Sequence, residues 1–111
     1  MIQSVGLDVV EVERIREAMK NPRFLERILT ANERKYCRTA QQVAGRWAAK
    51  EAAAKCMPGL NRWHQVEIVN DEIGKPMMIV RMQGLSGLRW HLSISHERGI
   101  AAAMVVLEQE D

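Results

Sequence analysis

The stretch RWAAKEAAAK, residues 46–55, decides the fold because it predicts the one long helix of the chain. Alanine is the best helix former, so a segment this rich in alanine needs no charged residues to stay helical. We expect the helix to run from about residue 42 to residue 57, where a Pro-Gly pair ends it. Four of the ten positions are nevertheless charged: Arg46, Lys50, Glu51 and Lys55. A single carboxylate among three cations calls for an explanation.

The segment at the start of the chain predicts a strand. Residues 2–10 alternate apolar and smaller or polar side chains, which places Gly6 and Asp8 together on one face of that strand. From Glu11 the apolar residues follow the helical period instead, up to about residue 21. The sequence therefore predicts a strand that leads directly into a helix.

Two short helices are expected between this helix and the long one. Asn21 can cap a helix with Pro22 at its first position. Thr30 and Glu33 have the spacing of a capping box, which predicts another helix from residue 30 to about residue 38. The first half of the chain is therefore helical after its opening strand.

The second half of the chain predicts strands. HQVEIVN (64–70) and MMIVRM (77–82) should pair as one hairpin, and RWHLSIS (89–95) and IAAAMVVLE (100–108) as another, with His96 at the tip of the second. Helices followed by strands indicate an α+β fold, in which an antiparallel sheet packs against the long helix. The length of 111 residues, 47% of them hydrophobic, predicts a single domain spanning residues 1–111.

Composition narrows the classes of function. The net charge of +2 is too small to indicate a nucleic-acid partner by itself, but residues 14–38 are rich in Lys and Arg and predict a basic face. No segment approaches the roughly eighteen apolar residues of a membrane span. Cys37 and Cys56 lack metal-site spacing and are expected to be free thiols in a reducing cytosol, so we expect a cytoplasmic protein.

Asp8 and Glu51 are the candidates for chemistry. Asp8 lies in an apolar strand, where an unpaired carboxylate costs several kcal/mol on burial. If the helix packs on that strand, Glu51 approaches Asp8, and two such carboxylates need a shared proton or a divalent metal such as magnesium. Lys50 and Lys55 would then neutralise the phosphates of a metal-bound substrate. Before any resemblance is considered, a buried ion pair of these carboxylates with Lys50 or Lys55 is equally consistent with the sequence.

Four segments together resemble a known family. They are GLDVVEVERI (6–15), RFLERILTANE (23–33), GRWAAKEAAAK (45–55) and LSISHERGIAAAMV (92–105), with GKP at 74–76. In this order they resemble the holo-acyl-carrier-protein synthases, the short bacterial 4′-phosphopantetheinyl transferases. The resemblance implies a cytoplasmic enzyme of fatty acid biosynthesis. Its reaction is a magnesium-dependent transfer of 4′-phosphopantetheine from coenzyme A to a serine of apo acyl carrier protein, which releases adenosine 3′,5′-bisphosphate.

The resemblance also implies roles for individual residues. Asp8 and Glu51 match the metal ligands, and Lys55 matches a lysine near the reacting phosphates. Arg46 and His96 match positions of coenzyme A binding. Arg14 and Arg23 match positions at which the acidic carrier protein docks. The family forms homotrimers with active sites between subunits, so we expect a trimer.

Two other classes of protein are consistent with parts of the sequence. A catalytically silent module that binds acidic carrier-type proteins would use the basic face without needing Asp8. A small nucleic-acid-binding domain would expose aromatic residues among the basic ones, but the chain has only five Phe, Trp and Tyr residues. Ser93 and Ser95 lack a base-and-acid arrangement, which argues against a serine hydrolase.

Overall fold

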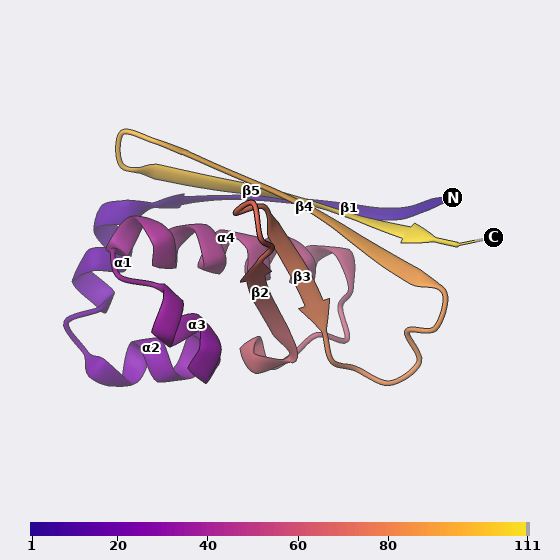
Figure 1. Ribbon diagram of the computed structural model, residues 1–111, viewed down its shortest axis with the longest axis horizontal. Coiled ribbons are helices and arrows are strands. Elements are labelled where there is room, and N and C mark those ends of the chain that lie inside the picture. Colours follow the sequence, from indigo (N-terminus) through magenta and orange to yellow (C-terminus); the bar gives the residue numbers. More distant parts are fainter. Residues whose placement is uncertain (111) are drawn as a thin grey trace.

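The computed structural model describes residues 1–110 and shows helices on one side of a long antiparallel sheet (Figure 1). The elements follow in the order β1 (Ile2–Glu11), α1 (Val12–Ala18), α2 (Pro22–Ile28), α3 (Ala31–Tyr36), α4 (Ala40–Cys56), η1 (Trp63–Gln65), β2 (Val66–Asn70), β3 (Pro76–Val80), β4 (Leu88–Glu97) and β5 (Ile100–Gln109). The strands form a three-stranded sheet in the order β1-β5-β4 and a two-stranded sheet β2-β3. The expected α+β class, with an antiparallel sheet on a long helix, is confirmed.

Helix α4 lies between the three-stranded sheet and the β2-β3 hairpin (Figure 1). Its small side chains allow this close packing, and they are completely buried: Ala44, Ala48, Ala49, Ala52 and Ala53. The closest approach is at Gly6 of β1, where an added Cβ would lie 2.0 Å from the carbonyl oxygen of Ala52. The strand and the helix can be this close only because residue 6 has no side chain. This contact brings the Asp8 face of β1 onto α4.

The helix starts follow the capping residues. Asn21 accepts a hydrogen bond from the backbone N–H of Arg23 at 3.0 Å, and Thr30 and Glu33 form the expected capping box. Helix α4 begins at Ala40 rather than near residue 42, because Thr39 and Gln42 form a second capping box. The hydroxyl of Thr39 accepts from the N–H of Gln42 at 3.2 Å.

Both expected hairpins form, with one correction. The β4-β5 turn consists of Arg98 and Gly99 only, both at positive φ, so His96 lies within β4 and not at the tip. The predicted turn was too long because His96 and Glu97 still pair with β5, opposite Ala101 and Ile100. Strand β5 also pairs with β1, which sets Asp8 opposite Ala103.

The outer face of the three-stranded sheet is apolar and exposed. In β1 the alternation buries Gly6 and leaves Val5, Leu7 and Val9 more than half exposed; Met104 of β5, the pairing partner of Leu7, is 47% exposed. Surfaces of this kind mark interaction sites in soluble proteins. No helix within residues 1–110 is long and apolar enough to cross a membrane.

Candidate functional site

Asp8 and Lys55 meet where β1 packs against the last turns of α4. The Nζ of Lys55 donates to Asp8 Oδ1 at 3.2 Å and to the backbone oxygen of Leu7 at 2.7 Å. The Asp8 side chain is only 12% exposed, and its second oxygen, Oδ2, is buried without a hydrogen-bond donor in the described chain. An ionised carboxylate with one unsatisfied oxygen is costly at this depth.

Glu51 lies one turn before Lys55 on the same side of α4 and interacts with Asp8. Burial, together with the hydrogen bond to Asp8 and the charge of that neighbouring carboxyl, raises the pKa of Glu51 to about 7, while Lys55 and Arg14 act in the opposite direction. Near neutral pH the metal-free protein therefore contains both protonated and ionised Glu51. Lys55, the exposed lysine that contacts Asp8, carries a single positive charge, which does not compensate the carboxylates of both Asp8 and Glu51.

This pair of carboxylates fits a divalent cation. The unsatisfied Asp8 oxygen and the raised pKa of Glu51 are both consistent with a local negative charge that Lys55 and Arg14 compensate only in part. Hard oxygen donors are the ligands that magnesium prefers, and magnesium is commonly held by one or two carboxylates with substrate phosphates and water in its other positions. Within residues 1–110 no three His, Cys, Asp or Glu side chains form a cluster that holds a metal by itself. Among residues 1–110, Asp8 and Glu51 are therefore the two side chains that could serve as metal ligands here.

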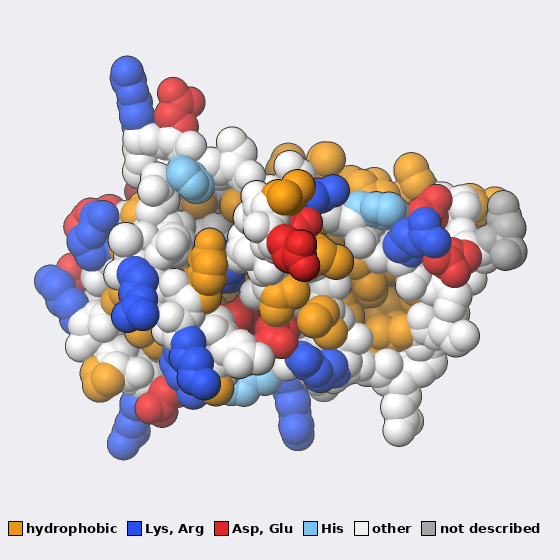
Figure 2. All heavy atoms as spheres, in the orientation of Figure 1, with side chains coloured by type: hydrophobic (Ala, Val, Ile, Leu, Met, Phe, Trp, Pro, Cys, Tyr) orange, Lys and Arg blue, Asp and Glu red, His pale blue; other side chains and the backbone are white. Residues whose placement is uncertain are grey.

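A cavity of about 290 Å³ opens beside Glu51. Arg14 of α1 lines it together with Phe24 of α2 and Trp47 of α4. Arg23 lies next to Phe24, exposed in the first turn of α2. Lys and Arg side chains gather over this end of the molecule, where α1, α2 and α3 lie (Figure 2). Arg14 therefore lies beside Glu51, and Arg23 is exposed on the neighbouring helix α2.

Arg46 and His96 line a different cavity, of about 240 Å³. The Arg46 guanidinium donates to Asn70 Oδ1 at 2.5 Å and lies 4.3 Å from the centre of the Tyr36 ring. Its Nε is buried and has no acceptor among the described residues. This cavity shares no lining residue with the one beside Glu51. Within one chain, the residues predicted for coenzyme A are therefore not joined to the carboxylate pair.

Lys50 does not belong to either cavity, and its predicted role as a partner of substrate phosphates is wrong. Its side chain is completely buried, and Nζ donates to Glu33 Oε1 at 2.6 Å, to Ile28 O at 2.7 Å and to Trp63 O at 3.1 Å. All three ammonium protons are therefore used inside the protein. Lys50 precedes Glu51 by one residue, but a step of one residue turns a helical side chain by about 100°.

Sequence reasoning missed several residues around the Arg46 cavity. Tyr36 and Asn70 hold the guanidinium, and Asn70 Nδ2 also donates to Gly74 O at 2.9 Å, which ties Arg46 to the GKP turn. The only sequence signal was the position of Asn70 at the start of that turn. Asn70 is the last residue of the expected strand 64–70, and nothing in its spacing indicated a contact with the long helix.

Comparisons with known proteins identify the family of the chain. The model of the 4′-phosphopantetheinyl transferase superfamily matches residues 4–105. The holo-[acyl-carrier-protein] synthase of Geobacillus kaustophilus is 45% identical, with 98% of this chain and 91% of that protein covered. The corresponding protein of Salinispora arenicola is 43% identical, with 98% of this chain and 100% of that protein covered.

Solved structures show the same fold. The crystal structure of the Bacillus anthracis holo-(acyl-carrier-protein) synthase, in complex with CoA (3′,5′-ADP), has a TM-score of 0.87 and 38% identity over 99% of both chains. The Helicobacter pylori holo-[acyl-carrier-protein] synthase in complex with coenzyme A also has a TM-score of 0.87, with 28% identity over 94% of this chain and 99% of that one. The chain therefore belongs to the 4′-phosphopantetheinyl transferase superfamily and, within it, to the holo-acyl-carrier-protein synthases.

Proposed function

We propose that this protein transfers 4′-phosphopantetheine from coenzyme A to a serine of apo acyl carrier protein, with magnesium held by Asp8 and Glu51. The observation that carries the proposal is the pair of undercompensated carboxylates with Lys55 beside it, at the edge of a cavity. The relatives named above are holo-acyl-carrier-protein synthases, and two of their structures contain coenzyme A or its nucleotide.

The residues have separate roles in this reaction. The serine hydroxyl attacks the phosphorus that carries the pantetheine, the bond between the two phosphates breaks, and adenosine 3′,5′-bisphosphate leaves. Phosphoryl transfer depends mainly on alignment and charge neutralisation. Asp8 and Glu51 would hold the magnesium ion, which would supply both when bound. Lys55 is half exposed and already directed at Asp8, so its ammonium group can also contact a phosphate oxygen.

The nucleotide end of coenzyme A fits the other cavity. Arg46 provides a fixed positive charge, and its buried Nε has an unused proton. His96 adds an imidazole N–H at the same cavity, which can donate to a phosphate oxygen. Asn70 and Tyr36 keep the guanidinium in place, so binding requires little rearrangement.

The separation of the two cavities supports a shared active site. We propose that three chains assemble as a homotrimer and that the carboxylate pair of one subunit meets the Arg46 and His96 cavity of its neighbour. The exposed apolar face made by Val5, Leu7, Val9 and Met104 supports this assembly, because burial in an interface removes it from water.

Arg14 and Arg23 are proposed to dock the carrier protein. Both are exposed, Arg14 beside Glu51 and Arg23 in the first turn of α2, and exposed positive charges attract an acidic partner and accelerate encounter. We place this single-domain enzyme in the cytoplasm, a location that suits its two free thiols, Cys37 and Cys56.

The direct test is to incubate the protein with magnesium chloride, coenzyme A and apo acyl carrier protein and to measure the mass of the carrier protein. We expect the mass to increase by one phosphopantetheine group, and we expect the increase to stop when a chelator is added. An unchanged carrier protein that still binds this chain would indicate the silent binding module instead.

A further inference from the structure

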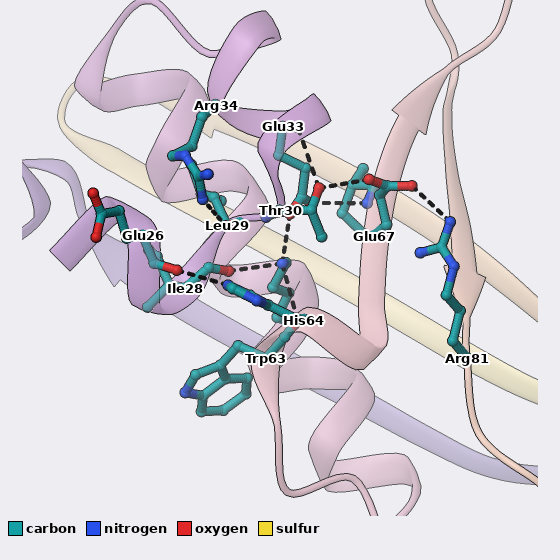
Figure 3. Close-up of polar contacts among 12 residues, drawn as sticks. Glu26, Ile28, Leu29, Thr30, Glu33, Arg34, Trp63, His64, Glu67 and Arg81 are labelled. Atoms are coloured by element: carbon teal, nitrogen blue, oxygen red, sulfur yellow. Dashed lines mark hydrogen bonds and ion pairs between the residues drawn. The ribbon is translucent and has the colours of Figure 1, made fainter. Parts of the chain in front are cut away.

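Three backbone carbonyls at the C-terminal end of α2 accept hydrogen bonds from side chains of three other elements (Figure 3). The donors are His64 of η1, Lys50 of α4 and Arg34 of α3, which reach the oxygens of Glu26, Ile28 and Leu29 respectively, each at 2.7 Å. A carbonyl oxygen can only accept, so the Nε2 of His64 carries the proton in this contact.

Helix α2 depends on these contacts for its position. It has seven residues, and an isolated helix of this length is not stable in water. The carbonyls in its last turn have no partner within the helix, and cationic side chains near a helix C-terminus both satisfy them and interact favourably with the helix dipole. The three donors therefore fix one end of α2 relative to the rest of the molecule.

Lys50 connects the largest number of elements in this cluster. Beside the Ile28 carbonyl it binds Glu33 of α3 and the backbone oxygen of Trp63 in η1. The other carboxylate oxygen of Glu33 accepts from the N–H of Ile68 in β2 at 2.9 Å. One buried ion pair thus holds α2, α3, η1 and β2 on α4.

The same contacts fix the aromatic wall of the cavity beside Glu51. The Trp47 ring lies between Phe24 of α2 and Trp63 of η1, with ring centres 6.4 Å and 4.7 Å away. Phe24 and Trp63 belong to α2 and η1, and backbone oxygens of these two segments accept hydrogen bonds from Lys50 or His64. The orientation of Phe24, and of the neighbouring Arg23, is therefore coupled to this cluster.

We propose that Lys50 and His64 are positioning residues for the carrier protein: they hold α2 in the orientation in which Arg23 and Phe24 extend the basic docking surface of Arg14. This inference depends on the proposed transferase function. Neither residue touches a substrate. Their effect is on how well the carrier protein docks. The side-chain hydrogen bond of His64 reaches α2, so coenzyme A binding at the Arg46 cavity is independent of it, whereas the Lys50–Glu33 pair also holds α3 and β2, which carry Tyr36 and Asn70 of that cavity.

The test compares steady-state kinetics of wild type, Lys50→Met, His64→Ala and His64→Gln with apo acyl carrier protein and coenzyme A each varied in turn. We expect His64→Ala to raise the KM for the carrier protein about threefold while the KM for coenzyme A stays within about twofold, and Lys50→Met to raise the KM for the carrier protein about tenfold. His64→Gln retains a side-chain N–H donor for the Glu26 carbonyl, so it should restore a KM near that of wild type. Lys50→Met takes the positive partner away from the buried Glu33 carboxylate, which destabilises the fold. If this variant does not fold, the comparison of His64→Ala with His64→Gln decides the test, because His64 is exposed.

The outcomes separate this inference from the proposed function. No transfer by the wild-type protein would overturn the proposed function and the inference with it. An active wild type whose variants keep the KM for the carrier protein would overturn only the positioning role. A fall in kcat with both KM values unchanged would also overturn it, because loss of folded enzyme lowers the active concentration without changing either KM.

Discussion

At the scale of single residues, Glu51 has the most unusual environment in the proposed site. Its carboxyl lies against Asp8, which has one unsatisfied oxygen, and Lys55 contacts only the other. A structural ion pair would match its charges, whereas this arrangement has one carboxylate in excess. The excess charge is the feature that suits a magnesium ion.

Replacing Glu51 with Gln should remove transferase activity while the fold is retained. Gln keeps the size of the side chain but provides no anionic ligand, so we expect activity to fall by about a thousandfold or more, with an unchanged circular dichroism spectrum. A matched control is Glu72→Gln, which neutralises an exposed carboxylate in the turn between β2 and β3. Near-full activity of Glu51→Gln would remove the metal assignment.

The raised pKa of Glu51 predicts how the stability of the metal-free protein depends on pH. The folded protein holds the Glu51 proton up to about pH 7, whereas an unfolded chain releases it near the ordinary value of 4.5. Between these values the native state binds more protons, so the contribution of Glu51 to stability is complete below about pH 4.5 and is lost as the pH rises through 7.

Urea unfolding with a chelator present, at several pH values, measures this effect. Glu51→Gln should be more stable than wild type at pH 8, by on the order of 1 kcal/mol after allowance for the partial solvent exposure of this side chain. The difference should shrink at pH 5. A constant difference at every pH would show that Glu51 has an ordinary pKa.

At the scale of elements, the site depends on how closely β1 approaches α4. Gly6 sets this distance, because a methyl group there would collide with the Ala52 backbone and push the strand away. Asp8 is two residues further along the same face of β1, so a displaced strand also separates Asp8 from Glu51. Gly6 therefore determines both how closely β1 packs on α4 and how close Asp8 lies to Glu51.

We therefore expect Gly6→Ala to lose about 3 kcal/mol of stability and most of its activity, measured by urea unfolding and by the mass assay. The control is Gly74→Ala, where φ is +87° and no heavy atom lies within 4 Å of the added Cβ, so only backbone strain of about 1–2 kcal/mol is expected. Equal stability of the two variants would contradict the close packing of β1 on α4.

The sequence predicted the elements whose signals are local. Asn21 and Thr30 cap their helices as expected, and alternation located the strands. The pairing of β1 with β5 was not predicted, because it joins residues about a hundred positions apart. Local spacing also could not show that Lys50 is buried: α4 is covered on several sides, so the usual contrast between an apolar and a solvated face is absent. The residues themselves left a metal site and a buried ion pair equally open for Asp8 and Glu51, and the family resemblance favoured the metal site. Only the tertiary structure shows that the two side chains interact.

At the scale of the whole molecule, one chain contains two separate halves of the proposed site. The carboxylate pair and the Arg46 cavity have no lining residue in common. An exposed apolar sheet face provides a surface for assembly. If the active site is completed by a neighbouring subunit, variants with different defects should compensate for each other.

Co-expression of Glu51→Gln with His96→Ala tests this arrangement. Each variant alone should be nearly inactive. In randomly mixed trimers about a quarter of the sites combine an intact Glu51 with an intact His96 from the neighbour, so we expect about a quarter of wild-type activity. Light scattering should give the mass of three chains. No recovery in mixed trimers would show that each site is built within one chain.

The central claim is that Asp8 and Glu51 together bind a divalent ion that contacts the diphosphate of coenzyme A. The most direct measurement is a crystal structure of the protein with coenzyme A and manganese, with the metal located by its anomalous scattering. We expect one manganese peak within coordination distance of Asp8 Oδ2 and a Glu51 oxygen, and in contact with the diphosphate. Coenzyme A bound with its diphosphate away from these carboxylates, or manganese bound elsewhere, would contradict the claim.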